Sequence, residues 1–187
     1  MIEVNNKLSI DMLKLICAQS NSRVAGFILY DERHPYLVKV LRQTEFWDAL
    51  DSISGRNWPI FAVNPQELPQ NKYGCNANFK SQIKVFLDLF GLNGSDDLPC
   101  FVVFTWDNDN KLLHNYYALS DSSEKEAFES IKNLVSDIAD TERQIKPEYR
   151  NGERVYLNSV IYLNQMITQQ QLRKILPELL SIFIKLS

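Results

Sequence analysis

The chain has 187 residues, of which 45% are hydrophobic and 23% charged, and its formal net charge is −3. This length fits one domain with an appendage, and the acidic balance argues against a nucleic-acid partner, because phosphate binding relies on clustered Lys and Arg. No stretch is apolar for long enough to span a bilayer, and no basic start followed by an apolar run indicates a secretory signal. Three scattered cysteines favour a reducing compartment over a disulfide framework, so we expect a cytoplasmic protein.

The first half of the chain alternates helix and strand patterns. Ser9 or Asp11 can cap an opening helix whose apolar residues recur at helical spacing. A continuous apolar run over residues 24–30 predicts a strand that is covered on both faces. Residues 58–63 predict a second short buried strand, and the polar stretch 66–76 predicts a loop.

A helix is predicted between these two strands. Pro35 suits its first turn, where a missing N–H is not needed, and apolar residues at three- and four-residue spacing continue to Gly55. Thr44 can instead cap a shorter helix, which would leave residues 36–41 as a strand. Beyond the polar loop, an amphipathic helix is predicted over 79–90, and the glycine that follows it is a natural stop.

A β-hairpin entered through Pro99 is the clearest pattern in the sequence. Residues 100–105 are β-branched and aromatic, and residues 112–119 form a second apolar-rich run. The Asp and Asn residues at 107–110 predict a polar turn. They lack the central glycine and distant Glu of a calcium-binding loop, so we expect no calcium site there.

The last predicted helix of the main domain begins near residue 122. Ser122 or Ser123 with Glu126 forms a capping box, and apolar residues follow at helical spacing. Strands that alternate with helices imply parallel crossovers, and the hairpin adds antiparallel strands to the same sheet. We therefore expect a domain over residues 1–146 with an α/β fold.

Residues 147–187 are an extension beyond this domain. The apolar stretch 154–163 is compatible with a strand or a helix. Thr168 then caps a helix with a wide apolar stripe, which Pro177 interrupts. This helix would either pack on the body of the protein or form a homodimer.

The order of these elements resembles the thioredoxin fold, in which a proline-led hairpin and a closing helix follow two strand and helix units. The resemblance covers roughly residues 24–140. Its most specific residues are Asp97-Leu98-Pro99, which look like the cis-proline segment at the start of that family's third strand. The family's Cys-x-x-Cys pair falls at Arg33-His34-Pro35-Tyr36, so this chain lacks the dithiol. We therefore expect a thioredoxin-like variant without redox cysteines, whose sheet is mixed and flanked by helices.

The resemblance implies a protein-binding or adaptor module rather than an enzyme. Arg33, His34 and Tyr36, together with the edge formed by Leu98 and Pro99, would engage a protein or peptide. Arg33 and His34 also lie at a predicted helix start, where backbone N–H groups favour an anion. We expect no cofactor and no metal, because the two histidines have no cysteine or carboxylate at metal spacing.

A second hypothesis is an enzyme, either a single-cysteine thiol oxidoreductase or a transferase that binds a thiol ligand. Cys100 follows the expected cis-proline, and Cys75 lies in the polar loop. A reactive thiolate would need a positive neighbour or a helix N-terminus to lower its pKa. A third hypothesis is that the chain forms another small α/β sandwich.

Overall fold

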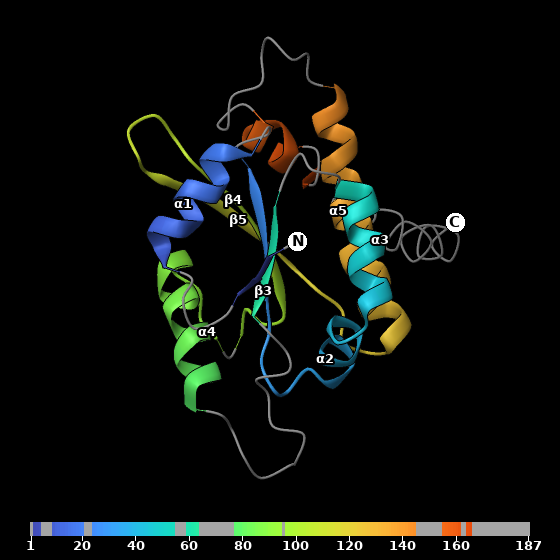
Figure 1. Cartoon of the computed structure of the whole chain (residues 1–187). Helices are drawn as coiled ribbons and strands as arrows, with labels where there is room; N and C mark the ends of the chain where they lie inside the picture. Colours follow the sequence, from blue (N-terminus) through green and yellow to red (C-terminus); the bar gives the residue numbers. More distant parts are fainter. Residues whose placement is uncertain are drawn as a thin grey trace, which may run out of the picture.

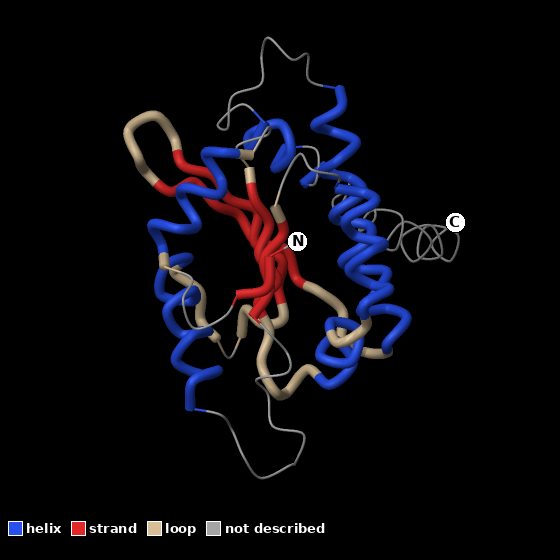
Figure 2. The backbone as a smooth tube through the Cα atoms, viewed as in Figure 1, coloured by secondary structure: helices blue, strands red, loops and turns tan. Residues whose placement is uncertain are grey.

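The computed structural model describes residues 2–4, 9–20, 24–54, 59–63, 77–94, 96–144, 155–161 and 164–165. Within these residues a mixed sheet lies between two layers of helices (Figures 1 and 2). This arrangement confirms the predicted α/β class. The loop over 66–76, Cys75 and the helix expected from Thr168 lie outside the described residues.

Five strands form the sheet within the described residues, in the order β1-β3-β2-β4-β5. Their bounds are β1 (Ile2–Val4), β2 (Ala25–Leu29), β3 (Ile60–Val63), β4 (Cys100–Trp106) and β5 (Leu112–Ala118). Strand β3 runs parallel to β1 and β2, whereas β4 is antiparallel to both of its neighbours, β2 and β5. The predicted parallel pair and the hairpin in the same sheet are therefore both confirmed.

Strand β1 was not predicted from the sequence. It has three residues, and a segment this short does not show a periodic pattern. Its register with β3 places Ile2 opposite Phe61 and Val4 opposite Val63. The pairing with β3 therefore defines this strand, and it makes β1 one edge of the sheet.

The helices cover both faces of the sheet. Their bounds are α1 (Ile10–Gln19), α2 (Pro35–Leu41), α3 (Thr44–Ser54), α4 (Ala77–Phe90) and α5 (Glu124–Gln144). Helices α1 and α4 lie on one face, and α3 and α5 on the other (Figure 1).

The ends of three helices lie where local capping residues predict them. The N–H of Met12 donates to Ser9 Oγ at 3.2 Å, and the N–H of Glu126 donates to Ser123 Oγ at 3.2 Å. Gly91 ends α4 with a φ of 60°, a conformation that glycine adopts freely.

The helix predicted from Pro35 to Gly55 is divided in two, and this prediction was wrong. Thr44 does begin a second helix, α3, but residues 35–41 form helix α2 rather than a strand. The indole N–H of Trp47 donates to the carbonyl of Leu41 at 2.8 Å, so a side chain of α3 satisfies a carbonyl in the last turn of α2. The break therefore lets each short helix pack separately against α5.

Phenylalanines dominate the core on the side of α4. Phe27 of β2 lies 4.5 Å from Phe86 and 5.9 Å from Phe61 between ring centroids. The ring centroids of Phe90 and Phe104 lie 5.3 Å apart. On the other face Phe46, Trp47 and Phe128 pack edge to face. The continuous apolar strands of the sequence are thus buried from both sides, as predicted.

The described part of the C-terminal extension is helical at residues 155–161, which decides between the strand and the helix left open by the sequence. Val155 and Tyr156 are buried and belong to the same core cluster as the sheet. Ser159 is also buried, and its hydroxyl donates to the carbonyl of Val155 at 2.8 Å. This turn of the extension therefore packs on the main domain.

Candidate functional site

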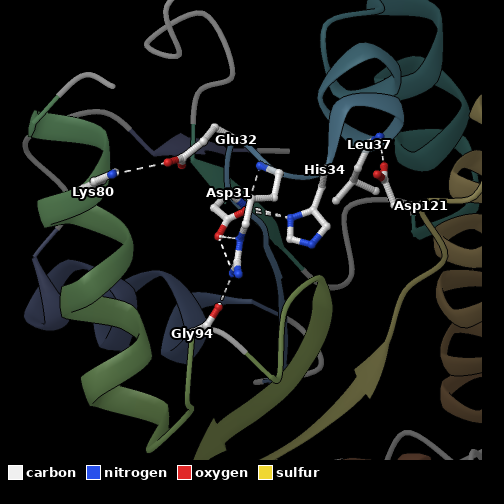
Figure 3. A network of polar contacts seen from close by, with 8 residues as sticks. Asp31, Glu32, His34, Leu37, Lys80, Gly94 and Asp121 are labelled. Atoms are coloured by element: carbon white, nitrogen blue, oxygen red, sulfur yellow. Dashed lines mark hydrogen bonds and ion pairs between the residues drawn. The ribbon is translucent and has the colours of Figure 1, made fainter. Parts of the chain in front are cut away.

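The predicted site centres on the loop between β2 and α2, at one end of the sheet. Pro35 occupies the first turn of α2 as predicted, and His34 is the residue that precedes this helix. Figure 3 shows the loop beside α4, with Gly94, from the segment before β4, below it. The chain thus brings together three segments that are distant in sequence.

Asp31 organises this loop. Its carboxylate accepts hydrogen bonds from the backbone N–H of Arg33 at 2.9 Å and from Arg33 Nε at 2.8 Å. Burial by itself would raise the pKa of Asp31, but the hydrogen bonds from His34 and Arg33 outweigh burial and hold that pKa well below its usual range. The sequence gives no sign of this role, because the adjacent carboxylates Asp31 and Glu32 are of a kind usually solvated.

Arg33 is exposed, but it does not extend freely into solvent. Its guanidinium pairs with Asp31 Oδ2 at 2.7 Å and donates from Nη2 to the carbonyl of Gly94 at 2.7 Å. Gly94 lies in the turn between α4 and β4, so Arg33 connects the loop after β2 to the segment that leads into β4. A residue predicted to contact a partner therefore also has a structural role.

His34 is buried, with 9% of its surface exposed. Its Nδ1 lies 2.9 Å from Asp31 Oδ1 and 3.2 Å from the backbone nitrogen of Asp31. A proton on Nδ1 would bond to the carboxylate, whereas an unprotonated Nδ1 would accept from the backbone N–H. Either state holds the ring against Asp31. His34 therefore supports the loop and offers a partner little surface, in contrast to Tyr36, which is 44% exposed.

The start of α2 is already occupied by a side chain of the same protein. The backbone N–H of Leu37 donates to Asp121 Oδ1 at 2.6 Å (Figure 3). Asp121 precedes α5, and Lys39 and Gln43 contact Glu124 in the first turn of that helix. An internal carboxylate thus already accepts from one backbone N–H at the helix start where an external anion was expected.

Leu98 and Pro99 lie beside this loop and are both partly exposed. The peptide bond between them is cis. The carbonyl of Pro99 accepts from the N–H of Leu119 at 2.9 Å. Among the described residues, nothing forms a hydrogen bond with the backbone N–H or carbonyl of Leu98. An extended partner chain could therefore use these two groups.

The cysteine next to this proline is not placed for thiolate chemistry. Cys100 is fully buried, and burial, with a smaller contribution from Asp97, raises its pKa to about 12. The environment thus stabilises the thiol over the thiolate, the opposite of what a nucleophile requires. Cys17 is likewise buried, and burial raises its pKa to about 12.

A pocket of about 330 Å³ opens between the loop after β2, helix α4 and the segment before β4. It contains two of the predicted site residues, Arg33 and Leu98. The remaining lining residues are Asp31, Glu32, Lys80, Ile83, Lys84, Leu87 and Gly94. Sequence reasoning missed the residues from α4, because a lysine on the exposed face of an amphipathic helix gives no signal of its own.

Figure 3 shows Lys80 extending from α4 toward Glu32, and the two charged groups lie 3.3 Å apart.

Within the described residues, no group of three or more His, Cys, Asp or Glu side chains is arranged to hold a metal ion. His114 is exposed on β5 and lies near the ring of Phe90. The turn at Asp107 is ordinary turn chemistry, because its carboxylate accepts from the N–H groups of Asp109 and Lys111.

Comparisons with protein-family models, with curated proteins and with solved structures find no match to this chain. In the described part of the chain, every helix is too short or too polar to cross a membrane.

Proposed function

We propose that this chain is a thioredoxin-like module that binds a protein or peptide and performs no dithiol chemistry. The strand order β1-β3-β2-β4-β5, with β4 antiparallel to both of its neighbours, supports the resemblance. The cis bond before Pro99 agrees with the expected proline segment. In the proposed resemblance, Arg33 and Tyr36 stand at the positions of the two redox cysteines.

The observation that carries the binding role is the combination of exposed and unpaired groups around the loop. Tyr36 is exposed on α2, and Leu98 presents its side chain and an unpaired backbone beside the pocket, as far as the described residues extend. An apolar surface with free backbone groups suits an extended peptide, which gains main-chain hydrogen bonds and side-chain contacts together. No described feature favours the thiol enzyme, since Cys100 is buried.

The proposal can be tested by site-specific photo-crosslinking. A benzophenone side chain would replace Tyr36 in the full chain, and a control chain would carry it at Leu15, which is 57% exposed on α1. We expect a discrete adduct from cell extract at position 36 that is absent from the control. A Leu98→Ala substitution should weaken this adduct, provided that the melting temperature shows the variant is folded.

Two results would contradict the proposal. Equal labelling at positions 36 and 15 would indicate contact without specificity. If Leu98→Ala left the adduct unchanged, Tyr36 and Leu98 would not belong to one binding surface. In either case the loop would be a structural element of the fold rather than a binding site.

A further inference from the structure

The charges that line the pocket do not cancel. Arg33 pairs with Asp31, and Lys80 pairs with Glu32 at 3.3 Å, which leaves Lys84. Within the described residues, the ammonium group of Lys84 makes no ion pair and no hydrogen bond. Lys84 lies one helical turn after Lys80, so both project from the same face of α4. Among the described residues, one positive charge of the pocket is therefore uncompensated.

An apolar surface lies next to this charge. Ile83 is buried, and Leu87 and Leu98 are partly buried against the core. Gly94 lines the pocket beside Leu87, and a Cβ at this position would lie only 2.8 Å from Leu87 Cδ1. The pocket thus combines an apolar floor with one cationic group, Lys84, that has no carboxylate partner among the described residues.

The dimensions indicate the kind of ligand. A volume of about 330 Å³ is at the lower end of the range for ligand pockets, roughly 300–1,000 Å³. It suits an apolar side chain with a neighbouring carboxylate better than a large cofactor. Leu98 lines the pocket and also presents unpaired backbone groups among the described residues, so a ligand with its own peptide backbone can use both.

We propose that this pocket binds an acidic peptide segment, with its carboxylate at Lys84 and an adjacent apolar side chain on the floor. This inference rests on the proposed function and specifies the chemistry of the partner. An ammonium group that gains a carboxylate partner in a partly enclosed site forms a charge-assisted hydrogen bond. The peptide satisfies the charge that the pocket's own carboxylates leave unpaired.

The test is a nuclear magnetic resonance titration of the isotope-labelled full chain with short synthetic peptides. The first probe is a six-residue peptide with blocked ends that contains an adjacent leucine and glutamate. The second peptide has glutamine in place of the glutamate. In the third, the leucine is the last residue and carries the free C-terminal carboxylate. We expect the amide signals of Lys84, Leu87 and Gly94 to shift, and one carboxylate peptide to bind about tenfold more tightly than the glutamine peptide.

Lys84→Gln should remove this tenfold preference. The matched control is Lys111→Gln, which removes the same charge from the exposed turn of the hairpin and should leave the preference intact. Gly94→Ala should also weaken binding, because its methyl group would lie 2.8 Å from Leu87 Cδ1 and force this lining side chain to move. The first and third probes distinguish a side-chain carboxylate from a chain terminus, and preference for either supports the proposal.

Three outcomes would overturn the inference. The glutamate and glutamine peptides, and the peptide with the free terminus, could bind equally well. The preference could survive in Lys84→Gln. Binding could also be absent with all three peptides. If instead the shifts gather at Tyr36 and are insensitive to Lys84→Gln, the acidic pocket is refuted while the proposed binding function stands, because the crosslinking experiment judges that function independently.

Discussion

Replacing Asp31 with asparagine tests the loop that supports the candidate site. The carboxylate is only 18% exposed, and it accepts hydrogen bonds from the backbone N–H and side chain of Arg33 and lies 2.9 Å from His34 Nδ1. Hydrogen bonds to a charged group contribute roughly 1.5–3 kcal/mol when buried. The guanidinium of Arg33 is exposed and solvent screens it, so the effect rests mainly on the backbone N–H and the histidine. We expect Asp31→Asn to lower the free energy of unfolding by about 1 kcal/mol at neutral pH.

The pH dependence of this difference follows from the pKa of Asp31, which is held well below its usual range in the folded protein. A carboxyl group whose pKa is depressed on folding contributes stability above its unfolded pKa, about 3.9. That contribution is lost as the pH falls through the folded pKa. The difference in the free energy of unfolding between the wild type and Asp31→Asn should therefore be largest near pH 7 and should shrink steadily below about pH 4.

Urea unfolding of the full chain at several pH values would measure this difference. Asp109→Asn is the matched control, because it removes one carboxylate from the exposed hairpin turn. The stabilising role of the Asp31 carboxylate would be refuted if Asp31→Asn were as stable as the wild type at neutral pH. It would also be refuted if the loss of stability were the same at every pH, since that would indicate a steric rather than an ionic cause.

Three further predictions concern the surrounding fold. Asp121→Ala should lower stability by about 1 kcal/mol in urea unfolding, because it removes the acceptor for the N–H of Leu37, and Asp121→Asn should recover most of this loss. Phe27→Ala should lower stability by about 3–5 kcal/mol, because the ring is fully buried against Phe86; a loss below about 1 kcal/mol would contradict the packing. In a Cys75→Ser background, Cys100 should not react with an aromatic disulfide reagent until denaturant is added, because burial raises its pKa to about 12. Rapid modification of the folded chain would restore the thiol-enzyme hypothesis.

The sequence predicted the features that depend on neighbouring residues. Helix starts at Ser9 and near Ser123, the stop at Gly91 and the hairpin after Pro99 all followed from groups a few positions apart. A cap or a turn is formed by hydrogen bonds over two to four residues, so its residues can be recognised in a linear pattern. The alternation of strands and helices then limited the fold to a mixed α/β sheet.

Other features depended on contacts that the sequence does not display. Three-residue β1 became a strand by pairing with β3, and the helix after Pro35 divided because α2 and α3 pack separately on α5. In both segments tertiary contacts determined the secondary structure, against what the local sequence pattern indicated. The sequence also predicted an external anion at the start of α2, where the structure places Asp121.

The candidate site divides in the same way. The resemblance selected Arg33, Tyr36 and Leu98, and the structure places Arg33 and Leu98 in one pocket with Tyr36 exposed nearby in sequence on α2. The sequence did not indicate Lys84, because a surface lysine becomes informative only when the charges facing it can be counted. The sequence by itself determined the capped helix ends, the hairpin and the loop to consider. Only the folded structure decided which charges in that loop are paired, since Asp121 and Leu37 are 84 positions apart and Arg33 and Gly94 are 61 apart.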